Sequence, residues 1–371
     1  MNKSLHIICF DVPYPANYGG VIDVMYRIKA LHDCGLNIIL HCFQYGHRGQ
    51  SEELQAYCTQ IYYYSRKKWG LSIKKPYIVS SRNDASLLEN LLQDDAPILF
   101  EAVHSTLLLT HPKISHRIKL VRMHNIEHDY YASLAKSERN LIKKAYYTLE
   151  SWMLSQYENK LKAAQYILAI SPKDELDLRA AFGDKVKLLP AFHGNKEIAI
   201  EPGKSDYCFY HGKLSVAENN VAALFLVNEV FAHIPYQLII AGDGASAELK
   251  KAVAKFNHIQ LLESVNADEI TQYIKKAHIN ILPTFQATGI KLKLVNVLFN
   301  GRFVLVNSQM VAETGLSAAT IIADNPITMQ EKIAELFTLE FDTIAIEERK
   351  TILAGQFDNM KHAKAFISLL D

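Results

Sequence analysis

The chain has few of the features that mark secreted, metal-binding, nucleic-acid-binding or membrane-spanning proteins. Its five cysteines are an odd number, widely spaced and without a Cys-x-x-Cys pair, which argues against a disulfide framework or a zinc site. Lys and Arg outnumber Asp and Glu by only 40 to 39, so the basic excess of a dedicated nucleic-acid binder is missing. No run of about 18 apolar residues occurs, and Met1–Pro15 does not resemble a signal peptide. We therefore expect a cytoplasmic protein.

What the chain does have is enough apolar sequence for two cores: 371 residues, 49% of them hydrophobic. Leu5–Phe10 is an apolar run typical of a buried strand, and Val21–Leu31 carries apolar residues at helical spacing. Asn37–Phe43 is the next expected strand. Strand, glycine-rich loop, helix and strand in this order open a doubly wound α/β domain.

The same alternation continues and then starts again after a segment rich in Pro and Gly, Leu188–Ser205. Helices are expected at Lys136–Lys162, as one long helix or two abutting ones, and at Val221–Ala232. We predict two Rossmann-like domains that face each other across a cleft, over residues 1–192 and 193–355. A helix at about 356–371 is expected to pack back on the first domain.

Two loops of the first half carry candidate site residues. Tyr18, Gly19 and Gly20 stand where the first helix begins, and the free N–H groups of a helix N-terminus favour anions. The pattern Gly-x-Gly-x-x-Gly is absent, which weakens a dinucleotide interpretation. Arg122–His128 follows an expected strand, so His124 and Asn125 lie where α/β sheets bind ligands. The alternative for Tyr18–Gly20 is a tight strand-to-helix turn without a ligand. The alternative for His124 is a histidine that caps a helix.

The second half offers two basic loops. Gly212-Lys213 follows an expected strand, where a lysine can meet a phosphate. Thr288, Gly289 and Ile290 would offer backbone N–H groups at the start of a helix, and Lys291 would add a positive charge. Together they suit a diphosphate leaving group, whereas each lysine alone could equally lie on a solvated helix face.

With these motifs in order, nearly the whole chain resembles the GT-B glycosyltransferases, specifically the retaining family 4 type. The resemblance is densest between Val265 and Gly315, where AHINILP (277–283), GIKLK (289–293) and GRFVLV (301–306) follow one another. It implies sugar transfer from a nucleotide-diphosphate sugar to a glycan or lipid-linked acceptor, with retention of anomeric configuration, in surface polysaccharide or lipopolysaccharide biosynthesis. It also implies hexosyl transfer without a metal or cofactor.

The resemblance assigns roles to the candidate residues. His124 would contact the transferred sugar, and Lys213 and Lys291 would bind the diphosphate. Backbone near Val265 would hold the nucleobase. The remaining substrate-binding positions would be Tyr18, Gly19, Gly20, Asn125, Gly212, Thr288, Gly289, Ile290 and Asn296.

One departure from the family pattern bears on activity. The family has a glutamate that binds the donor ribose where this chain has Asn296, and its partner glutamate is replaced by Thr288 or Gln286. Losing a charge-assisted hydrogen bond would weaken donor binding by about 1–2 kcal/mol. A non-catalytic GT-B module or partner subunit therefore stays open as an alternative. A GT-B epimerase is a further alternative, although no convincing set of carboxylates is evident.

The segment 66–82 carries six basic residues and no acidic one, interleaved with aromatic and aliphatic side chains. This composition suits an anionic membrane surface, so we expect peripheral contact on the inner face of the membrane. A solvated loop with a few packed aromatics is the alternative.

Overall fold

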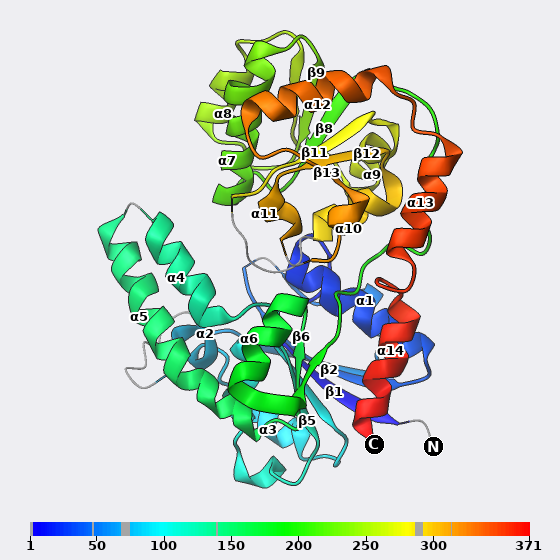
Figure 1. Ribbon diagram of the computed structural model, residues 1–371. Coiled ribbons are helices and arrows are strands. Elements are labelled where there is room, and N and C mark those ends of the chain that lie inside the picture. Colours follow the sequence, from blue (N-terminus) through cyan, green and yellow to red (C-terminus); the bar gives the residue numbers. More distant parts are fainter. Residues whose placement is uncertain (1–2, 47, 68–74, 139, 286–291, 313) are drawn as a thin grey trace. The chain divides into compact units, whose positions relative to one another are not determined.

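The computed structural model describes residues 3–46, 48–67, 75–138, 140–285, 292–312 and 314–371. Its contacts divide the chain into two compact units. Unit 1 comprises Met1–His193 together with Phe357–Asp371, and unit 2 comprises the described residues between Gly194 and Gln356. Each unit is a parallel sheet with helices (Figure 1).

The sheet of unit 1 has seven strands in the order β3-β2-β1-β4-β5-β6-β7, and every recorded pairing is parallel. The order runs outward from β1 in both directions, as in doubly wound folds, so the strand order reverses between β1 and β4. The strands are β1 Ser4–Cys9, β2 Asn37–Gln44, β3 Gln60–Ser65, β4 Ile98–Glu101, β5 Lys119–Arg122, β6 Tyr166–Ala169 and β7 Val186–Leu188.

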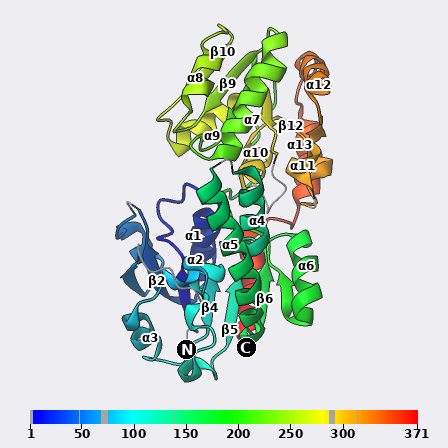
Figure 2. The same ribbon diagram turned by 90° about the vertical axis from the view of Figure 1, so that its left-hand side faces the viewer.

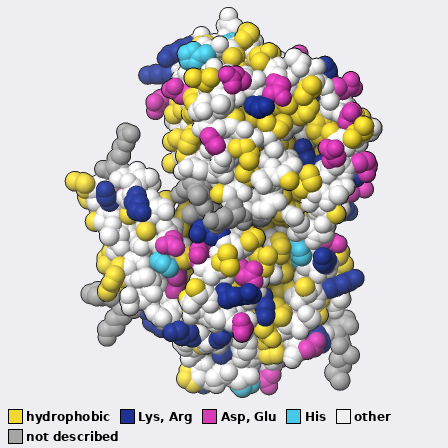
Figure 3. Space-filling view, in the orientation of Figure 1, with side chains coloured by type: hydrophobic (Ala, Val, Ile, Leu, Met, Phe, Trp, Pro, Cys, Tyr) yellow, Lys and Arg dark blue, Asp and Glu magenta, His cyan; other side chains and the backbone are white. Residues whose placement is uncertain are grey.

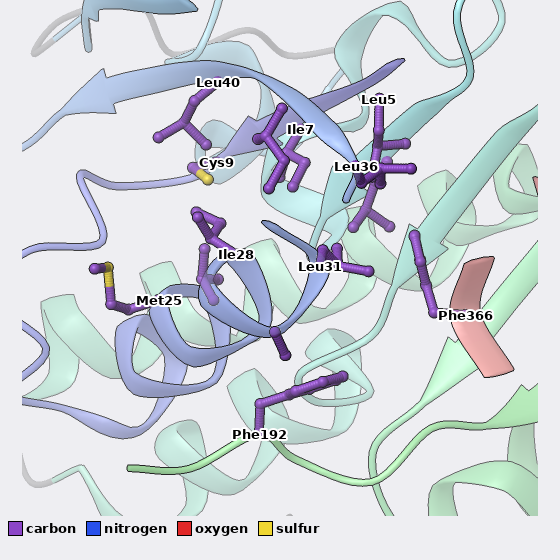
Figure 4. Close-up of a cluster of buried hydrophobic side chains, with 14 of the residues drawn as sticks. Leu5, Ile7, Cys9, Met25, Ile28, Leu31, Leu36, Leu40, Phe192 and Phe366 are labelled. Atoms are coloured by element: carbon purple, nitrogen blue, oxygen red, sulfur yellow. The ribbon is translucent and has the colours of Figure 1, made fainter. Parts of the chain in front are cut away.

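Alternating side chains of these strands feed two separate cores, one on each face of the sheet. Leu5, Ile7 and Cys9 point into a core with helix α1, whereas Ile8 belongs to the core on the other face. Figure 4 shows the first of these cores. Both faces are therefore buried, which explains why the strands read as continuous apolar runs. The helices of unit 1 are α1 Gly19–Asp33, α2 Tyr77–Ser80, α3 Ala85–Leu91, α4 Glu127–Ser137, α5 Leu141–Tyr157, α6 Pro172–Phe182 and α14 Asn359–Ile367.

Helix α14, from the end of the chain, packs in the same core as α1 (Figure 1). Phe366 and Ala363 are fully buried there. The segment leading into α14 is tied to unit 1 as well, since the Asn359 side chain bonds both the N–H and the carbonyl of His193. Residues far apart in the sequence thus complete one core.

Helices α4 and α5 form a hairpin, visible in both ribbon views (Figures 1 and 2). The sequence left open one helix or two over Lys136–Lys162; the structure has two, and α4 already begins at Glu127. Asn140 caps α5 by accepting hydrogen bonds from the N–H groups of Ile142 and Lys143. Figure 3 shows hydrophobic and basic side chains next to one another over this hairpin.

Unit 2 repeats the plan of unit 1 with six parallel strands in the order β10-β9-β8-β11-β12-β13. Its strands are β8 Tyr207–His211, β9 Gln237–Ala241, β10 Ile259–Leu262, β11 Ile279–Leu282, β12 Phe303–Val306 and β13 Ile321–Ile322. Its helices are α7 Ala217–Phe225, α8 Ala247–Val253, α9 Ala267–Lys276, α10 Leu292–Asn300, α11 Ser308–Val311, α12 Pro326–Thr338 and α13 Thr343–Leu353. The helix expected at Val221–Ala232 begins earlier, at Ala217, and its α-helical part ends at Phe225.

Two further findings concern strands and membranes. Sequence patterns missed β3, because in this edge strand only Tyr64 is buried and no apolar run marks it. None of the helices in the described parts of the chain is long and apolar enough to cross a bilayer.

Candidate functional site

The loops that follow β1, β4 and β5 bring several predicted site residues to the C-terminal edge of the unit 1 sheet. Ligands of open α/β sheets bind at this edge, at the point where strand order reverses. The loop after β1 leads into Tyr18–Gly20, and the segment after β5 begins the stretch with His124 and Asn125. Neighbouring strands β1, β4 and β5 therefore deliver the two predicted loops to one edge.

The turn at Tyr18–Gly20 starts α1 as predicted, with no side chain capping the helix. The Tyr18 hydroxyl donates to Asp11 Oδ2 over 2.7 Å. Burial, followed by the nearby Asp11 carboxylate, raises the pKa of Tyr18, so its proton stays on the oxygen. At Gly20 a Cβ atom would lie 2.9 Å from Cζ of Phe10, so a side chain there would push on that ring.

His124 sits directly beyond β5 and is held by a carboxylate. Its Nε2 lies 2.9 Å from Oε2 of Glu101, and its side chain is only 8% exposed. The ring also meets Phe10 edge-on, with centroids 5.3 Å apart. Because Glu101 accepts the proton of Nε2, the tautomer with an unprotonated Nδ1 is favoured. Nδ1 has no hydrogen-bond partner in the described part of the chain, so it can accept from a ligand hydroxyl.

Beneath His124 lies a buried ion network that the sequence did not reveal. Asp23 of α1 accepts from Arg27 over 2.8 Å and from two nitrogens of Arg122 over 3.2 Å each. Arg27 also pairs with Glu101, the partner of His124. All four charged side chains are fully buried. Burial favours the neutral acid, but Arg122 and Arg27 outweigh it and hold the pKa of Asp23 well below its ordinary value.

This network gives His124 a fixed support. The ring is anchored on Glu101, Glu101 on Arg27, and Arg27 on a helix buried in the core. A sequence signal was present but was not used: Asp23 and Arg27 are four residues apart on the apolar face of α1, where charges are rare unless paired. Glu101 likewise ends a fully buried strand.

Asn125 and the residues after it form a second buried polar group. The Asn125 side chain bonds Glu127, whose carboxylate lies 3.8 Å from Nδ1 of His104. Burial, and then the nearby Glu158 charge, raise the pKa of Glu127 to about 8, so the carboxyl is mostly neutral at pH 7. His128 instead pairs with Glu158 over 2.7 Å. Glu127 and His128 are therefore engaged inside unit 1.

In unit 2, the predicted Gly212-Lys213 turn follows β8 and is packed tightly against the loop after β9. A Cβ atom on Gly242 would lie 1.8 Å from the carbonyl oxygen of Gly212, so only glycine fits there. The carbonyl of Lys213 accepts from Nδ2 of Asn219 over 3.0 Å. The Oδ1 of that amide in turn accepts from Nζ of Lys293 over 3.0 Å.

Lys293 therefore reaches the Gly212-Lys213 turn from the start of α10, a contact that the sequence did not predict. Its ammonium group also lies 5.4 Å from the ring centre of Tyr210. The ammonium group of Lys293 is thus held near the C-terminal end of β8, where the backbone of Lys213 also lies. The predicted residues Thr288, Gly289, Ile290 and Lys291 lie outside the described residues.

The two other predicted positions of unit 2 lie on separate elements. Val265 is in the loop between β10 and α9, beside Ser264, whose N–H donates to Asp243 over 2.7 Å. Asn296 is partly buried on α10, where its Oδ1 accepts from the amide of Asn300 over 3.1 Å. The oxygen of Asn296 is thus already engaged by a neighbouring side chain.

The two remaining predictions concern membrane contact through residues 66–82 and metal binding. In the segment 66–82, residues 68–74 lie outside the described residues, and membrane contact there stays a prediction. Its described ends are packed, since Arg66 lies over Tyr77 and Arg82 is buried. In the described residues no cluster of three or more His, Cys, Asp or Glu side chains is placed to hold a metal ion.

Comparison with known proteins agrees with this architecture. No protein-family model matches the chain. An uncharacterized 44.6 kDa protein in the cps region of Klebsiella pneumoniae is 25% identical over 347 residues, covering 88% of this chain and 89% of that protein. Among solved structures, TarM superposes with a TM-score of 0.69 at 9% identity, over 100% of this chain and 99% of TarM. The lipopolysaccharide outer core galactosyltransferase WaaB gives 0.67 at 14%, over 99% of each chain.

The chain has the GT-B fold. Trehalose-6-phosphate synthase OtsA gives a TM-score of 0.62 at 13% identity, over 99% of each chain, so three differently named enzymes share the plan. Likeness at these identities establishes architecture, and the predicted pair of Rossmann-like domains is confirmed.

Proposed function

We propose that the chain is a glycosyltransferase that moves a sugar from a nucleotide-diphosphate sugar to a glycan or lipid-linked acceptor. The observation that carries this proposal is His124, anchored by Glu101 at the ligand-binding edge of a GT-B unit with Nδ1 left unpaired. A rigid acceptor nitrogen at that position suits one sugar hydroxyl. Preorganised polar groups of this kind stabilise a developing charge without reorganising during the reaction.

The donor diphosphate is assigned to unit 2. The ammonium group of Lys293 is joined through Asn219 to the carbonyl of Lys213 at the end of β8, and only glycine fits at position 242 against this turn. Lys291 and the backbone of Thr288–Ile290 are proposed to complete this site. Cations and N–H groups there would stabilise the charge that builds on the departing diphosphate.

The finer features of the reaction belong to the same proposal. We propose transfer of a hexose with retention, by a path in which the departing phosphate helps to deprotonate the acceptor, without a metal. Asn296 offers the donor ribose an amide in place of a carboxylate, and its oxygen is held by Asn300. Donor binding is therefore expected to be weaker than in a site with a charged acceptor.

The biological setting is proposed from the named relatives. WaaB is a lipopolysaccharide outer core galactosyltransferase, and the 25% identical relative lies in a cps region. One similar structure is bound with UDP-2-fluoro glucose, and a TarM mutant is in complex with UDP. A role in surface polysaccharide biosynthesis with a nucleotide sugar as donor follows as the proposal.

A thermal-shift screen over nucleoside diphosphates and nucleotide sugars tests the donor site, since a ligand that binds only the folded chain raises Tm. Lys291→Ala is expected to abolish the shift. The matched control is Lys332→Ala on α12, which removes an exposed lysine paired with Glu335 and should leave the shift intact. An unchanged shift in Lys291→Ala would remove that lysine from the site.

The alternative of a non-catalytic binding module is favoured by Asn296 and by Thr288 or Gln286 in place of the partner glutamate. Saturation by a nucleoside diphosphate without turnover of any nucleotide sugar would support this alternative. Acceptor-dependent turnover of one donor would exclude it.

Peripheral contact with an anionic membrane is proposed alongside the transferase activity, on the cytoplasmic side. Helix α5 adds a second surface to the predicted segment 66–82. Leu141 and Ile142 are about four-fifths exposed, and Trp152, about three turns further along the helix, is also exposed. Lys143 and Lys144 flank them, and residues 136–149 carry four basic residues and one acidic. Apolar insertion beside basic groups is what anionic lipid surfaces favour.

A further inference from the structure

Two arginines of unit 1 have no carboxylate partner among the described residues, unlike the buried arginines Arg27, Arg117 and Arg122. Arg82 is 4% exposed, and its guanidinium bonds only backbone carbonyls, those of Phe10 and Ile78. Arg66 is half-buried and donates to the Ser81 hydroxyl over 3.1 Å. Neither forms an ion pair within the described part of the chain. Arg27 and Arg122, by contrast, share Asp23.

The two arginines lie next to each other and to a third polar group. The N–H of Lys67, the residue after Arg66, donates to the carbonyl of Ser81, the residue before Arg82, over 2.8 Å. Burial, and then the positive charge of Arg66, lower the pKa of Arg82. His104 lies close by, because its ring is 5.6 Å from that of Phe10, whose carbonyl accepts from Arg82. Burial, followed by Arg82 and Arg66, lowers its pKa as well. Its buried Nδ1 has no hydrogen-bond partner among the residues that the structure describes.

Three acidic groups lie near this cluster, and in the described residues none of them forms an ion pair with Arg66 or Arg82. Burial raises the pKa of Glu150, Arg66 is among the groups that lower it, and Oε1 of Glu150 accepts from the N–H of Ile78 over 2.9 Å. Asp11 is engaged by the Tyr18 hydroxyl and lies 3.5 Å from Nε of Arg48. The raised pKa of Glu127 leaves that carboxyl mostly neutral at pH 7. An uncompensated buried charge is costly, so a structure keeps one where a ligand supplies the counter-charge.

Other buried arginines show what a purely structural role looks like. In unit 2, Arg302 bonds the carbonyls of Lys276 and Ala277 at the end of α9, together with a third carbonyl. Helix C-termini carry partial negative charge, so these contacts offset the cation. Arg82 has only the four-residue helix α2 beside it, and a second arginine adds to its charge.

The place of the cluster in the fold points to a ligand. Arg66 directly follows β3, His104 lies in the 3-10 turn after β4, and Phe10, which Arg82 contacts, follows β1. These are C-terminal strand ends of the same sheet edge that carries His124. A guanidinium has five N–H donors in a planar fork, and Arg82 uses two of them on carbonyls.

We propose that Arg66 and Arg82 form a binding site for an oxyanion, a phosphate or a carboxylate, carried by the acceptor. The assignment of the anion to an acceptor rests on the proposed function, because unit 2 is assigned the donor. Arg66 is the accessible member and receives the anion, and Arg82 supplies the deeper charge. The acceptor is then an anionic glycan or a phosphate-linked one, and a neutral sugar lacks the group that this site holds.

The test uses the full chain and isothermal titration calorimetry with inorganic phosphate, glucuronate and, as the neutral control, glucose. Arg66→Gln is expected to raise the Kd of the preferred anion about tenfold or more, since it removes charge-assisted hydrogen bonds. Arg82→Gln should do the same. Arg179→Gln, an exposed arginine of unit 1 paired with Glu175, is the matched control and should bind like wild type.

The outcomes distinguish a phosphate-bearing acceptor from an acidic sugar, and the arginine site from the proposed transferase function. Tighter phosphate binding assigns a phosphate-bearing acceptor, and tighter glucuronate binding assigns an acidic sugar. If Arg82→Gln fails to fold, Arg66→Gln decides, because Arg66 is only half-buried, with one hydrogen bond to the Ser81 hydroxyl and contacts with the rings of Tyr45 and Tyr77. Anion binding unchanged in Arg66→Gln, or absent from wild type, overturns the site. Loss in Lys291→Ala but not in Arg66→Gln would place the anion in unit 2 and overturn it too. A chain that binds phosphate through Arg66 but no nucleotide sugar keeps this site and loses the proposed function.

Discussion

Asp23→Asn is the sharpest test of the support beneath His124. The carboxylate accepts four hydrogen bonds: one from Arg27, two from Arg122, and one of 2.8 Å from the N–H of Phe192. An asparagine keeps the shape, but its single oxygen can serve only one side of this arrangement, and its NH₂ group then faces donors. Two charge-assisted bonds are lost at about 1.5–3 kcal/mol each.

The expected loss in the free energy of unfolding is therefore about 3–5 kcal/mol, the range seen when a buried ion pair loses one partner. Urea unfolding, followed by circular dichroism and tryptophan fluorescence, measures it. Both tryptophans, Trp69 and Trp152, lie in the part of the chain that forms unit 1, so fluorescence reports on that unit. Wild type should keep its advantage down to the ordinary carboxyl pKa of about 4 and lose it only in stronger acid, because the pKa of Asp23 is lowered in the fold.

Asp177→Asn is the matched control for this prediction. Asp177 pairs with Lys173 four residues earlier on α6, and both side chains are about half exposed. Surface pairs of this kind contribute about 0.3–0.5 kcal/mol. If Asp23→Asn cost no more than this control, the buried network would not be what fixes Glu101 and His124.

Three further changes address other parts of the chain. Glu127→Gln should abolish a dependence of the free energy of unfolding on pH. The folded carboxyl, with its pKa raised to about 8, holds a proton that the unfolded chain releases near pH 4.5. The wild-type free energy of unfolding therefore falls as the pH rises between these values, by at most about 1.4 kcal/mol per pH unit. Tm measured at pH 5 and pH 8 checks this, and an equal gap between variant and wild type at both would refute it. Gly242→Ala should lower the free energy of unfolding by about 3 kcal/mol, because the new Cβ overlaps the Gly212 carbonyl. Gly49→Ala, with open space around it, should lower it little. Similar melting points for the two variants would contradict the packing described. Ile142→Glu should weaken flotation with anionic vesicles, and wild-type binding should fall at high salt; equal flotation of both proteins would remove α5 from the lipid surface.

The arrangement of strands and helices was largely predictable from hydrophobic periodicity. Leu5–Phe10 and Asn37–Phe43 read as buried runs because both faces of the sheet are covered, and α1 follows from its apolar spacing. β3 escaped because an edge strand with one buried side chain carries no such pattern. The beginnings of α4 and α7 were misplaced, since neither has a side-chain cap to mark it.

Some residues of the candidate site could likewise be predicted from the sequence, and others could not. His124 and Gly212-Lys213 could be proposed because each directly follows a strand, where ligands of α/β sheets bind. Glu101 and Lys293 could not, because their partners are distant in sequence and meet them only in the folded chain. Asp23 could have been noticed, because Arg27 lies four residues further along the same helix. Arg66 and Arg82 stood out as basic residues, but only the structure shows that neither pairs with a carboxylate within the described ranges.

The central claim is sugar transfer, and the most direct measurement is acceptor-dependent release of nucleoside diphosphate from a panel of nucleotide sugars. The account predicts that wild type consumes at least one donor when a phosphate-bearing or acidic acceptor is added, and that His124→Ala, folded to the same Tm, loses most of this turnover. Folded wild-type chain that consumes no donor with any such acceptor, or a His124→Ala variant that turns over at the wild-type rate, would contradict it.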